Sequence, residues 1–164
     1  MATIIISFIV FVSLAVLDQV TKLIFFGKSF SLIGDFLWIE GSSLNTGAAG
    51  GMLAGQMWLF ISLAVIASAV CIYMMISKKF STSAFFKISV AITFAGIVGN
   101  LIDRIIFNGV RDFIYFKSIN FFIFNFADIY LTIGAVCLCI YLLFLHKDAP
   151  LKRKTKSEEK VKDE

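Results

Sequence analysis

The sequence predicts an all-α membrane protein with four transmembrane helices and a small β-sheet outside the membrane. Of its 164 residues, 59% are hydrophobic and only 16% are charged, against roughly 25% charged in a soluble domain. Mean hydropathy is +0.92, and the chain holds 19 phenylalanines and one proline. Four apolar stretches reach the ~20 residues that a helix needs to cross ~30 Å of hydrocarbon. They are residues 3–26, 57–77, 85–107 and 126–146.

The first stretch, 3–26, is predicted to be a permanent helix rather than a cleaved signal peptide. It has no positively charged leader, its apolar run is long, and no small-residue cleavage site follows it.

The segment after the first helix, 27–56, is long for a plain connection. Residues 36–39 have strand character and are flanked by turn-forming glycine, aspartate and serine. Residues 121–124 are predicted to form either a second short strand or a lip at the membrane interface. We therefore expect a small sheet resting on the outer membrane surface.

Positive charge predicts the orientation. Lys78 and Lys79 lie between the second and third stretches, and seven Lys or Arg residues lie in 147–164. Because cytoplasmic loops are enriched in Lys and Arg, both termini are predicted to be cytoplasmic, with 27–56 and 108–125 outside.

The chain is thus expected to form one membrane domain, 1–146, followed by a polar tail, 147–164. The tail is rich in Lys and Glu and is predicted to be disordered. Its mixed charge argues against nucleic-acid binding and favours proximity to anionic lipid.

Four aspartates are predicted to lie at the same depth in the membrane. At about 1.5 Å per helical residue, Asp18 lies about 21 Å up the first helix and Asp103 lies at a similar height in the third. Asp112 follows in the outer segment, and Asp128 lies in the first turn of the fourth helix. A carboxylate near lipid is costly, so acids gathered at one level predict a functional site near the outer leaflet.

Each of these residues also has a purely structural interpretation. Asn125 and Asp128 could only cap the fourth helix. Asp103 and Arg104 could form an interfacial ion pair, with Arg104 snorkelling.

The remaining polar residues are open to the same kind of interpretation. Asp18 and Lys22, at i and i+4, could form an ion pair with a structural role only. Asp112 could be a solvated loop charge, and the segment from Asn45 to Gly51 a flexible turn.

Two other classes of function stay open on the residues alone. Asp18, Asp103 and Asp128 could form a proton or ion relay, although the predicted cytoplasmic halves of the spans carry few polar residues. The chain could also be a non-catalytic scaffold that tolerates loss of its acids. We expect no metal or other cofactor, because the three cysteines have no metal-ligand spacing and are predicted to be small buried hydrophobic residues.

Taken together, five segments resemble lipoprotein signal peptidase, the signal peptidase II of bacteria. No segment is decisive alone, but their order and spacing from residue 18 to about 134 are specific. They are Asp18-Gln19-Val20-Thr21-Lys22, Asn45-Thr46-Gly47-Ala48-Ala49, Gly99-Asn100-Leu101-Ile102-Asp103-Arg104, Val110-Arg111-Asp112-Phe113-Ile114 and Phe124-Asn125-Phe126-Ala127-Asp128.

The resemblance implies a four-helix bundle in the bacterial cell membrane with an extracytoplasmic β-cradle. It implies an aspartic endopeptidase, without cofactor and expected to be monomeric, that cleaves diacylglyceryl-prolipoproteins on the amino side of the lipidated cysteine. By motif, the catalytic pair is Asp112 and Asp128. The matching substrate-binding or supporting residues are Asp18, Asn45, Asn100, Asp103, Arg104 and Asn125.

Two positions depart from the usual pattern of that family. Arg111 stands where an apolar residue is usual, and Gly50 replaces a bulky residue. We expect Arg111 to affect either the approach of lipid headgroups or the proton affinity of Asp112.

Overall fold

The computed structural model describes residues 2–42, 44–47, 53, 55–77 and 83–146. Within this part, four helices are long and apolar enough to cross a membrane, as predicted. The bounds lie within one residue of the prediction, except that the last regular helix ends at Ile140 and continues as a π-helical turn, η3 (Tyr141–Leu145). The helices are α1 (Ala2–Phe25), α2 (Met57–Ile76), α3 (Ala84–Phe107) and α4 (Phe126–Ile140).

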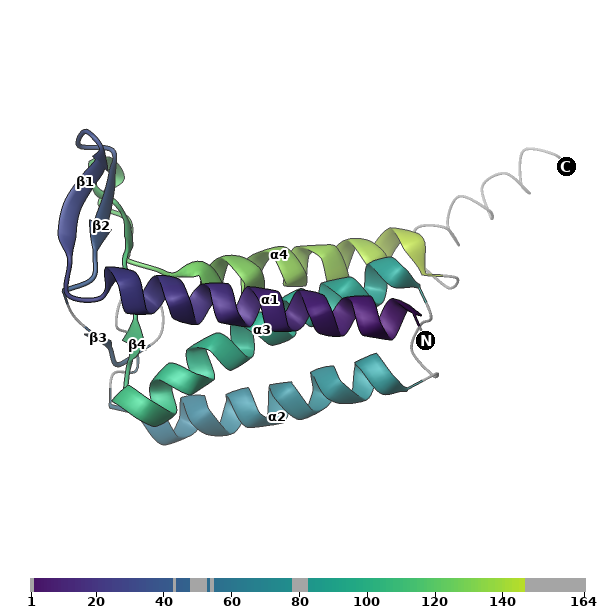
Figure 1. Cartoon of the computed structure of the whole chain (residues 1–164). Helices are drawn as coiled ribbons and strands as arrows, with labels where there is room; N and C mark the ends of the chain where they lie inside the picture. Colours follow the sequence, from purple (N-terminus) through teal and green to yellow (C-terminus); the bar gives the residue numbers. More distant parts are fainter. Residues whose placement is uncertain (1, 43, 48–52, 54, 78–82, 147–164) are drawn as a thin grey trace, which may run out of the picture.

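The helices form one bundle with the sheet at one end (Figure 1). α1 and α3 run toward the sheet, and α2 and α4 run away from it. α3 packs against each of the other three, and half of its most apolar stretch is buried inside the protein, compared with 17% or less in the others. The outer helices therefore expose many of their apolar side chains on the outside of the bundle, as crossing a membrane requires.

Two glycines allow α3 to approach its neighbours closely. A Cβ atom on Gly96 would lie 2.5 Å from the carbonyl oxygen of Ala127 in α4, and one on Gly99 would lie 2.5 Å from Oδ2 of Asp18 in α1. Small residues are what permit such close packing of membrane helices. The halves of α1, α3 and α4 nearest the sheet are thereby in close contact. Polar side chains lie in this same part of the bundle.

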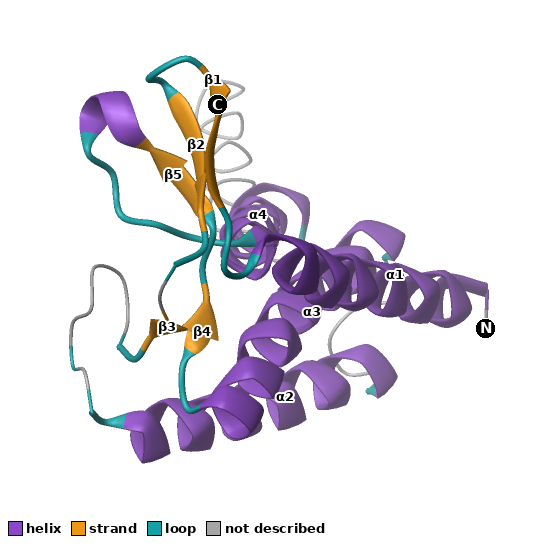
Figure 2. Ribbon diagram, turned by 60° about the vertical axis from the view of Figure 1, so that its left-hand side comes forward, coloured by secondary structure: helices purple, strands orange, loops and turns teal. Residues whose placement is uncertain are grey.

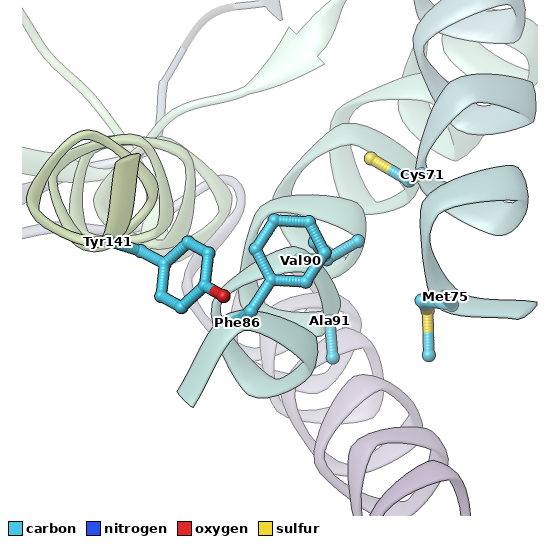
Figure 3. Close-up of a cluster of buried hydrophobic side chains, with 6 residues drawn as sticks. All are labelled: Cys71, Met75, Phe86, Val90, Ala91 and Tyr141. Carbon is cyan, nitrogen blue, oxygen red and sulfur yellow. The ribbon is translucent and has the colours of Figure 1, made fainter. Parts of the chain in front are cut away.

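A hydrophobic cluster packs the opposite end of the bundle (Figure 3). Cys71 is buried there, but Cys139 is exposed, so the prediction that all three cysteines are buried was wrong. Lys87, unanticipated as a buried residue, donates from Nζ to the carbonyl of Met75 at 2.7 Å. It thereby satisfies a carbonyl in the last turn of α2. The cluster consists of Cys71, Met75, Phe86, Val90, Ala91 and Tyr141.

The larger sheet is antiparallel, in the order β1 (Ser29–Ile33), β2 (Leu37–Glu40) and β5 (Ile114–Phe116) (Figure 2). The strand predicted at 36–39 is confirmed as β2. Of the two forms predicted for residues 121–124, the strand is not the one observed, because only Phe124 pairs, in an isolated bridge to Ile114.

A 3-10 turn, η2 (Lys117–Ile119), follows β5 and ends at Asn120 in a left-handed conformation. It reverses the chain, so Phe121 and Phe122 lie exposed beyond the sheet, with ring centroids 3.9 Å apart. This segment is an aromatic lip, the other form that the sequence predicted for it.

A second, two-stranded sheet joins the outer segments. β3 (Leu44–Asn45) pairs antiparallel with β4 (Val110–Arg111), with Asn45 opposite Val110. Strands of two residues leave no periodic pattern, so the sequence did not predict this pairing. It places the side chain of Asn45 beside the residue that follows β4, Asp112.

Three features named from the sequence lie outside the described residues. They are the tail 147–164, the connection carrying Lys78 and Lys79, and residues 48–51 of the turn considered from Asn45 to Gly51, which include Gly50.

Candidate functional site

A pocket of about 280 Å³ lies at the sheet end of the bundle, between α3, α4 and the β3–β4 pair. Asp112 and Asp128 both line it, with Asn45, Asn100 and Arg104. Its remaining lining residues are mainly apolar: Gly47, Val110, Phe122, Ile123, Leu131 and Thr132.

Asp112 follows β4 directly and is 5% exposed. Both of its oxygens accept hydrogen bonds from amides: Oδ2 from Nδ2 of Asn45 at 2.9 Å, and Oδ1 from Nδ2 of Asn125 at 2.6 Å. Burial, and then the charge of Asp128, raise the pKa of Asp112 to about 6, although the two amide hydrogen bonds oppose this shift. Asp112 is therefore a carboxyl group that keeps its proton to a higher pH than an ordinary aspartate does.

The residue after Asp112 fixes the backbone on that side. The ring of Phe113 is buried between Phe25, at a centroid distance of 5.1 Å, and Phe126, at 5.9 Å. The Phe113 amide donates to the Phe124 carbonyl at 3.1 Å. Asp112 thus has little freedom to move away from α4.

Asp128 lies in the first turn of α4, in a capping box with Asn125. The Asp128 amide donates to Oδ1 of Asn125 at 3.2 Å, and the Asn125 amide donates to Oδ2 of Asp128 at 3.0 Å. Nδ2 of Asn100 donates to Oδ1 of Asp128 at 2.8 Å. The capping interpretation of Asn125 and Asp128 is confirmed, but it accounts for only part of their contacts.

Asn125 is the link between the two acids. Its carbonyl oxygen caps α4 at Asp128, while its Nδ2 donates to Asp112 and, at 3.1 Å, to Oδ1 of Asn100. The side chain is fully buried. A rigid amide that contacts both carboxyl-bearing residues fixes their relative positions.

Behind the pocket lies a buried charge cluster, formed by Asp18, Lys22, Asp103 and Arg111. Nζ of Lys22 lies 2.9 Å from Oδ2 of Asp18 and 3.7 Å from Oδ2 of Asp103, and all three side chains are fully buried. The predicted i,i+4 pair of Asp18 and Lys22 is confirmed. Two acids and two bases balance, so the cluster carries no formal net charge.

The buried charge cluster reaches the pocket through hydrogen bonds. Nζ of Lys22 donates to Oδ1 of Asn100 at 3.0 Å, and Asn100 in turn donates to Asp128. Oδ1 of Asp18 accepts from the Ala127 amide at 2.9 Å, beside Asp128. The cluster therefore positions the start of α4 from two directions.

The alternative interpretation of Asp103 and Arg104 as an ion pair does not hold, because the salt bridges of Asp103 among the described residues go to Arg111 and Lys22. Consecutive helical residues point about 100° apart, and Asp103 faces α1 while Arg104 faces the pocket. Asp103 instead pairs with Arg111, at 2.7 Å from Oδ1 to Nη2. The guanidinium of Arg104 lies over the Phe60 ring at 5.1 Å, and its buried Nε has no hydrogen-bond partner among the described residues.

Arg111 was expected to meet lipid headgroups or to alter Asp112. The first expectation was wrong, because the side chain is 6% exposed and turns inward to Asp103. Gln19 was not predicted as a site residue, yet its Oε1 accepts from Arg111 at 2.9 Å and its Nε2 donates to the Gly99 carbonyl at 3.0 Å. Its place directly after Asp18 in the first motif was the available signal.

The eight predicted site residues form one connected region. Asn45, Asn100, Arg104, Asp112 and Asp128 line the pocket. Asn125 bonds to three of them, and Asp18 and Asp103 lie one step further, through Lys22. The roles of these residues in a reaction stay predictions.

Comparison with known proteins identifies close relatives. A sequence profile described as signal peptidase (SPase) II matches residues 10–144. The lipoprotein signal peptidase of Staphylococcus carnosus (strain TM300) is 38% identical over 148 residues, spanning 85% of this chain and 92% of that protein. That of Staphylococcus aureus (strain JH9) is 39% identical over 144 residues, spanning 84% and 87%.

Two solved structures share the fold. Both are described as bacterial membrane enzymes determined by the in meso method, at 2.3 Å and 1.9 Å resolution. The first has a TM-score of 0.75 at 38% identity and covers 84% of this chain and 87% of its own. The second has a TM-score of 0.74 at 37% identity and covers 85% and 94%.

Proposed function

The chain belongs to the signal peptidase II family, and from this premise we propose that it cleaves its substrates as an aspartic endopeptidase. Membership makes it a multi-pass membrane peptidase that removes signal peptides from lipoproteins. We assign Asp112 and Asp128 as the catalytic pair. The observation that carries the assignment is the single pocket that both line, with Asn125 in contact with each.

The pair carries one shared proton. Two neighbouring carboxyls in a buried site resist double ionisation, so their titrations belong to the pair. The pKa of about 6 for Asp112, raised by burial and by the charge of Asp128, supports Asp112 as the protonated member. Asp128 is then the ionised member and the general base.

The reaction begins with a water molecule held between the two acids. Asp128 takes a proton from this water as its oxygen attacks the scissile carbonyl carbon, and Asp112 donates a hydrogen bond to the carbonyl oxygen. Collapse of the tetrahedral intermediate breaks the C–N bond, and a carboxyl proton passes to the leaving amine. The products are the carboxylate of the signal peptide and the amino group of the lipidated cysteine.

The supporting residues orient the two acids and the substrate. Asn45 and Asn125 orient the two oxygens of Asp112, and Asn100 orients Asp128. Arg104 brings a cation to the wall of the pocket, and its buried Nε has no hydrogen-bond partner in the described part of the chain. We assign it to a backbone carbonyl or a headgroup oxygen of the substrate.

The substrate is a prolipoprotein whose cysteine carries diacylglycerol, cleaved on the amino side of that cysteine. Phe122, Ile123 and Leu131 give the pocket an apolar wall beside the two acids. Each CH₂ group buried is worth about 0.8 kcal/mol, but the bilayer already supplies that energy. Selection for the lipidated substrate therefore rests on shape and on headgroup contacts such as those of Arg104.

The active site faces the outer leaflet of the bacterial cell membrane, and both termini are cytoplasmic. The structure supports this topology because α1 begins and η3 ends at the end of the bundle opposite the sheet (Figure 1). α2 also ends and α3 begins at that end, and the sequence between these two helices carries Lys78 and Lys79. That the enzyme is monomeric stays a prediction.

Replacement of each acid tests the proposal. Asp112→Asn and Asp128→Asn should each abolish cleavage of a synthetic diacylglyceryl-prolipopeptide in detergent micelles while leaving the protein folded. Asp35→Asn is the matched control, because Asp35 lies exposed on the sheet and pairs only with Lys117 among the described residues. Parent-level cleavage by either pocket variant would exclude the catalytic pair.

A further inference from the structure

Asp112 is held from both sides by its chain neighbours, in two different ways. Phe113 is fixed by aromatic packing against Phe25 and Phe126. Arg111 is fixed by charge, through its ion pair with Asp103. It is the one member of the buried charge cluster that lies outside the helices, in β4.

The contact between Arg111 and Asp103 has three parts. Nη2 of Arg111 donates to Oδ1 of Asp103 at 2.7 Å, Nε donates to Oδ2 at 3.2 Å, and the Arg111 backbone amide donates to Oδ2 at 2.9 Å. The planar guanidinium thus binds one carboxylate through two parallel hydrogen bonds. The bond from the backbone amide ties the main chain immediately before Asp112 to α3.

Two further contacts fix the guanidinium itself. Nη2 also donates to Oε1 of Gln19 in α1 at 2.9 Å, and the guanidinium carbon lies 4.4 Å from the centroid of the Phe107 ring. Arg111 therefore joins β4 to both α1 and α3. A lysine could supply the charge but not this planar, multidentate geometry.

Arg111 also completes the charge balance of the cluster. Without it, Asp18 and Asp103 would share the single cation Lys22, which lies 0.8 Å closer to Asp18 (2.9 Å against 3.7 Å). The cluster would then carry one uncompensated negative charge in a region that water does not reach. That charge lies close to the pocket, since Lys22 bonds directly to Asn100.

We propose that Arg111 is a positioning residue for Asp112, which holds the catalytic carboxyl in register with Asp128 through its bidentate contact with Asp103. This role rests on the catalytic pair proposed above. Arg111 is not among the residues that line the pocket, so its effect on the reaction passes through Asp112.

The pH profile is an informative readout because several charged groups surround Asp112. Loss of the Arg111 charge makes this surrounding more negative, so Asp112 keeps its proton to higher pH and the alkaline limb of the kcat/KM profile moves upward. The side chain of Glu40 on β2 is occupied with Ser29 and Ser42. The other charged groups are Asp128 from α4, Lys22 from α1, Arg104 and Asp103 from α3, and Arg111 from β4.

The test compares Arg111→Met and Arg111→Lys with Lys117→Met, a matched cation on the same side of the molecule that is exposed. Full-length variants are assayed on a diacylglyceryl-prolipopeptide in detergent, with thermal unfolding measured alongside. A displacement of Asp112 by about 1 Å should lower kcat by roughly 10- to 100-fold in Arg111→Met. KM should stay within about 2-fold, because Arg111 does not line the pocket. The alkaline limb of the kcat/KM profile should move to higher pH, because the charge of Arg111 is lost.

Arg111→Lys separates geometry from charge. Its kcat should fall while its alkaline limb stays in place, and Lys117→Met should match the parent in both. The double variant Arg111→Met/Asp103→Asn removes both charges, so its loss of kcat should be smaller than the product of the single losses. Arg111→Lys remains decisive if Arg111→Met fails to fold.

Parent values of kcat and pH profile in folded Arg111→Lys or Arg111→Met would overturn the inference. So would a loss confined to KM, or strictly multiplicative losses in the double variant. Asp112→Asn serves as the reference in the same assay. If it is inactive while the Arg111 variants match the parent, only this inference fails; if it is active, the catalytic pair itself fails.

Discussion

Asn125→Ser is the sharpest probe of how the two acids are coupled. Serine retains an oxygen that can cap α4, because Ser and Asn are nearly equivalent N-cap residues. It cannot replace Nδ2 of Asn125, which donates to Oδ1 of Asp112 at 2.6 Å and to Asn100 at 3.1 Å. The substitution therefore removes the amide link while leaving the helix start in place.

The size of the effect follows from the lost bond. A hydrogen bond to a charged group is worth about 1.5–3 kcal/mol, which corresponds to a rise of about 1–2 units in the pKa of the acceptor at about 1.4 kcal/mol per unit. The bond lowers the pKa of Asp112, which stands at about 6. Its loss should place that pKa at about 7–8.

The assay is the pH dependence of kcat/KM for a diacylglyceryl-prolipopeptide, which reports titrations of the free enzyme. Activity requires a proton on Asp112, so the parent should lose activity as pH rises through about 6. In Asn125→Ser this alkaline limb should lie about 1–2 pH units higher. The maximal rate should fall about 10- to 100-fold because Asp112 is no longer oriented.

Asn125→Ala supplies the comparison. It loses the donor and the cap together, so it should share the pH shift and also unfold more easily, by about 1 kcal/mol. An alkaline limb in folded Asn125→Ser that stays at the parent position, or moves to lower pH, would refute the coupling argued here.

Three further predictions concern stability in detergent. Asp112→Asn should raise the free energy of unfolding at pH 7 by up to about 3 kcal/mol, because ionising Asp112 in the folded state costs energy when its pKa is raised from 3.8 to about 6. That advantage should shrink as pH falls through this interval and vanish below it; a constant difference would contradict it. Lys22→Met should cost about 3–5 kcal/mol by leaving two buried carboxylates without their shared cation, whereas Lys28→Met, at an exposed position nearby, should unfold like the parent. Gly99→Ala should cost about 1–3 kcal/mol through overpacking, since its Cβ would lie 2.5 Å from Oδ2 of Asp18; a thermal midpoint equal to that of the parent would show that α1 and α3 can separate without cost.

The sequence predicted the helices well because crossing a bilayer is a requirement on local composition. About 20 apolar residues in a row suffice to indicate a span, and the bounds of α2 and α3 were predicted to within one residue. The cap at Asn125 was predictable for the same reason, since its partner Asp128 lies three residues away.

Partners distant in sequence were predictable only in part. The depth argument brought Asp18, Asp103, Asp112 and Asp128 to one level, and the structure places them around one pocket and the cluster behind it. The position of a residue along a helix does not tell in which direction its side chain points around the helix axis. The sequence therefore left open a pairing of Asp103 with its neighbour Arg104, whereas Asp103 faces Arg111 and Lys22.

The sequence by itself determined which segments cross the membrane, where the polar residues fall along each helix, and which family the motifs resemble. Each of these properties depends on residues that are close together in the chain. Only the tertiary structure decided that Asn45 reaches Asp112 through the β3–β4 pair, and that Arg111 turns inward to complete a neutral cluster. Those contacts depend on strand register and helix rotation, which the packing of distant segments sets and no local pattern encodes.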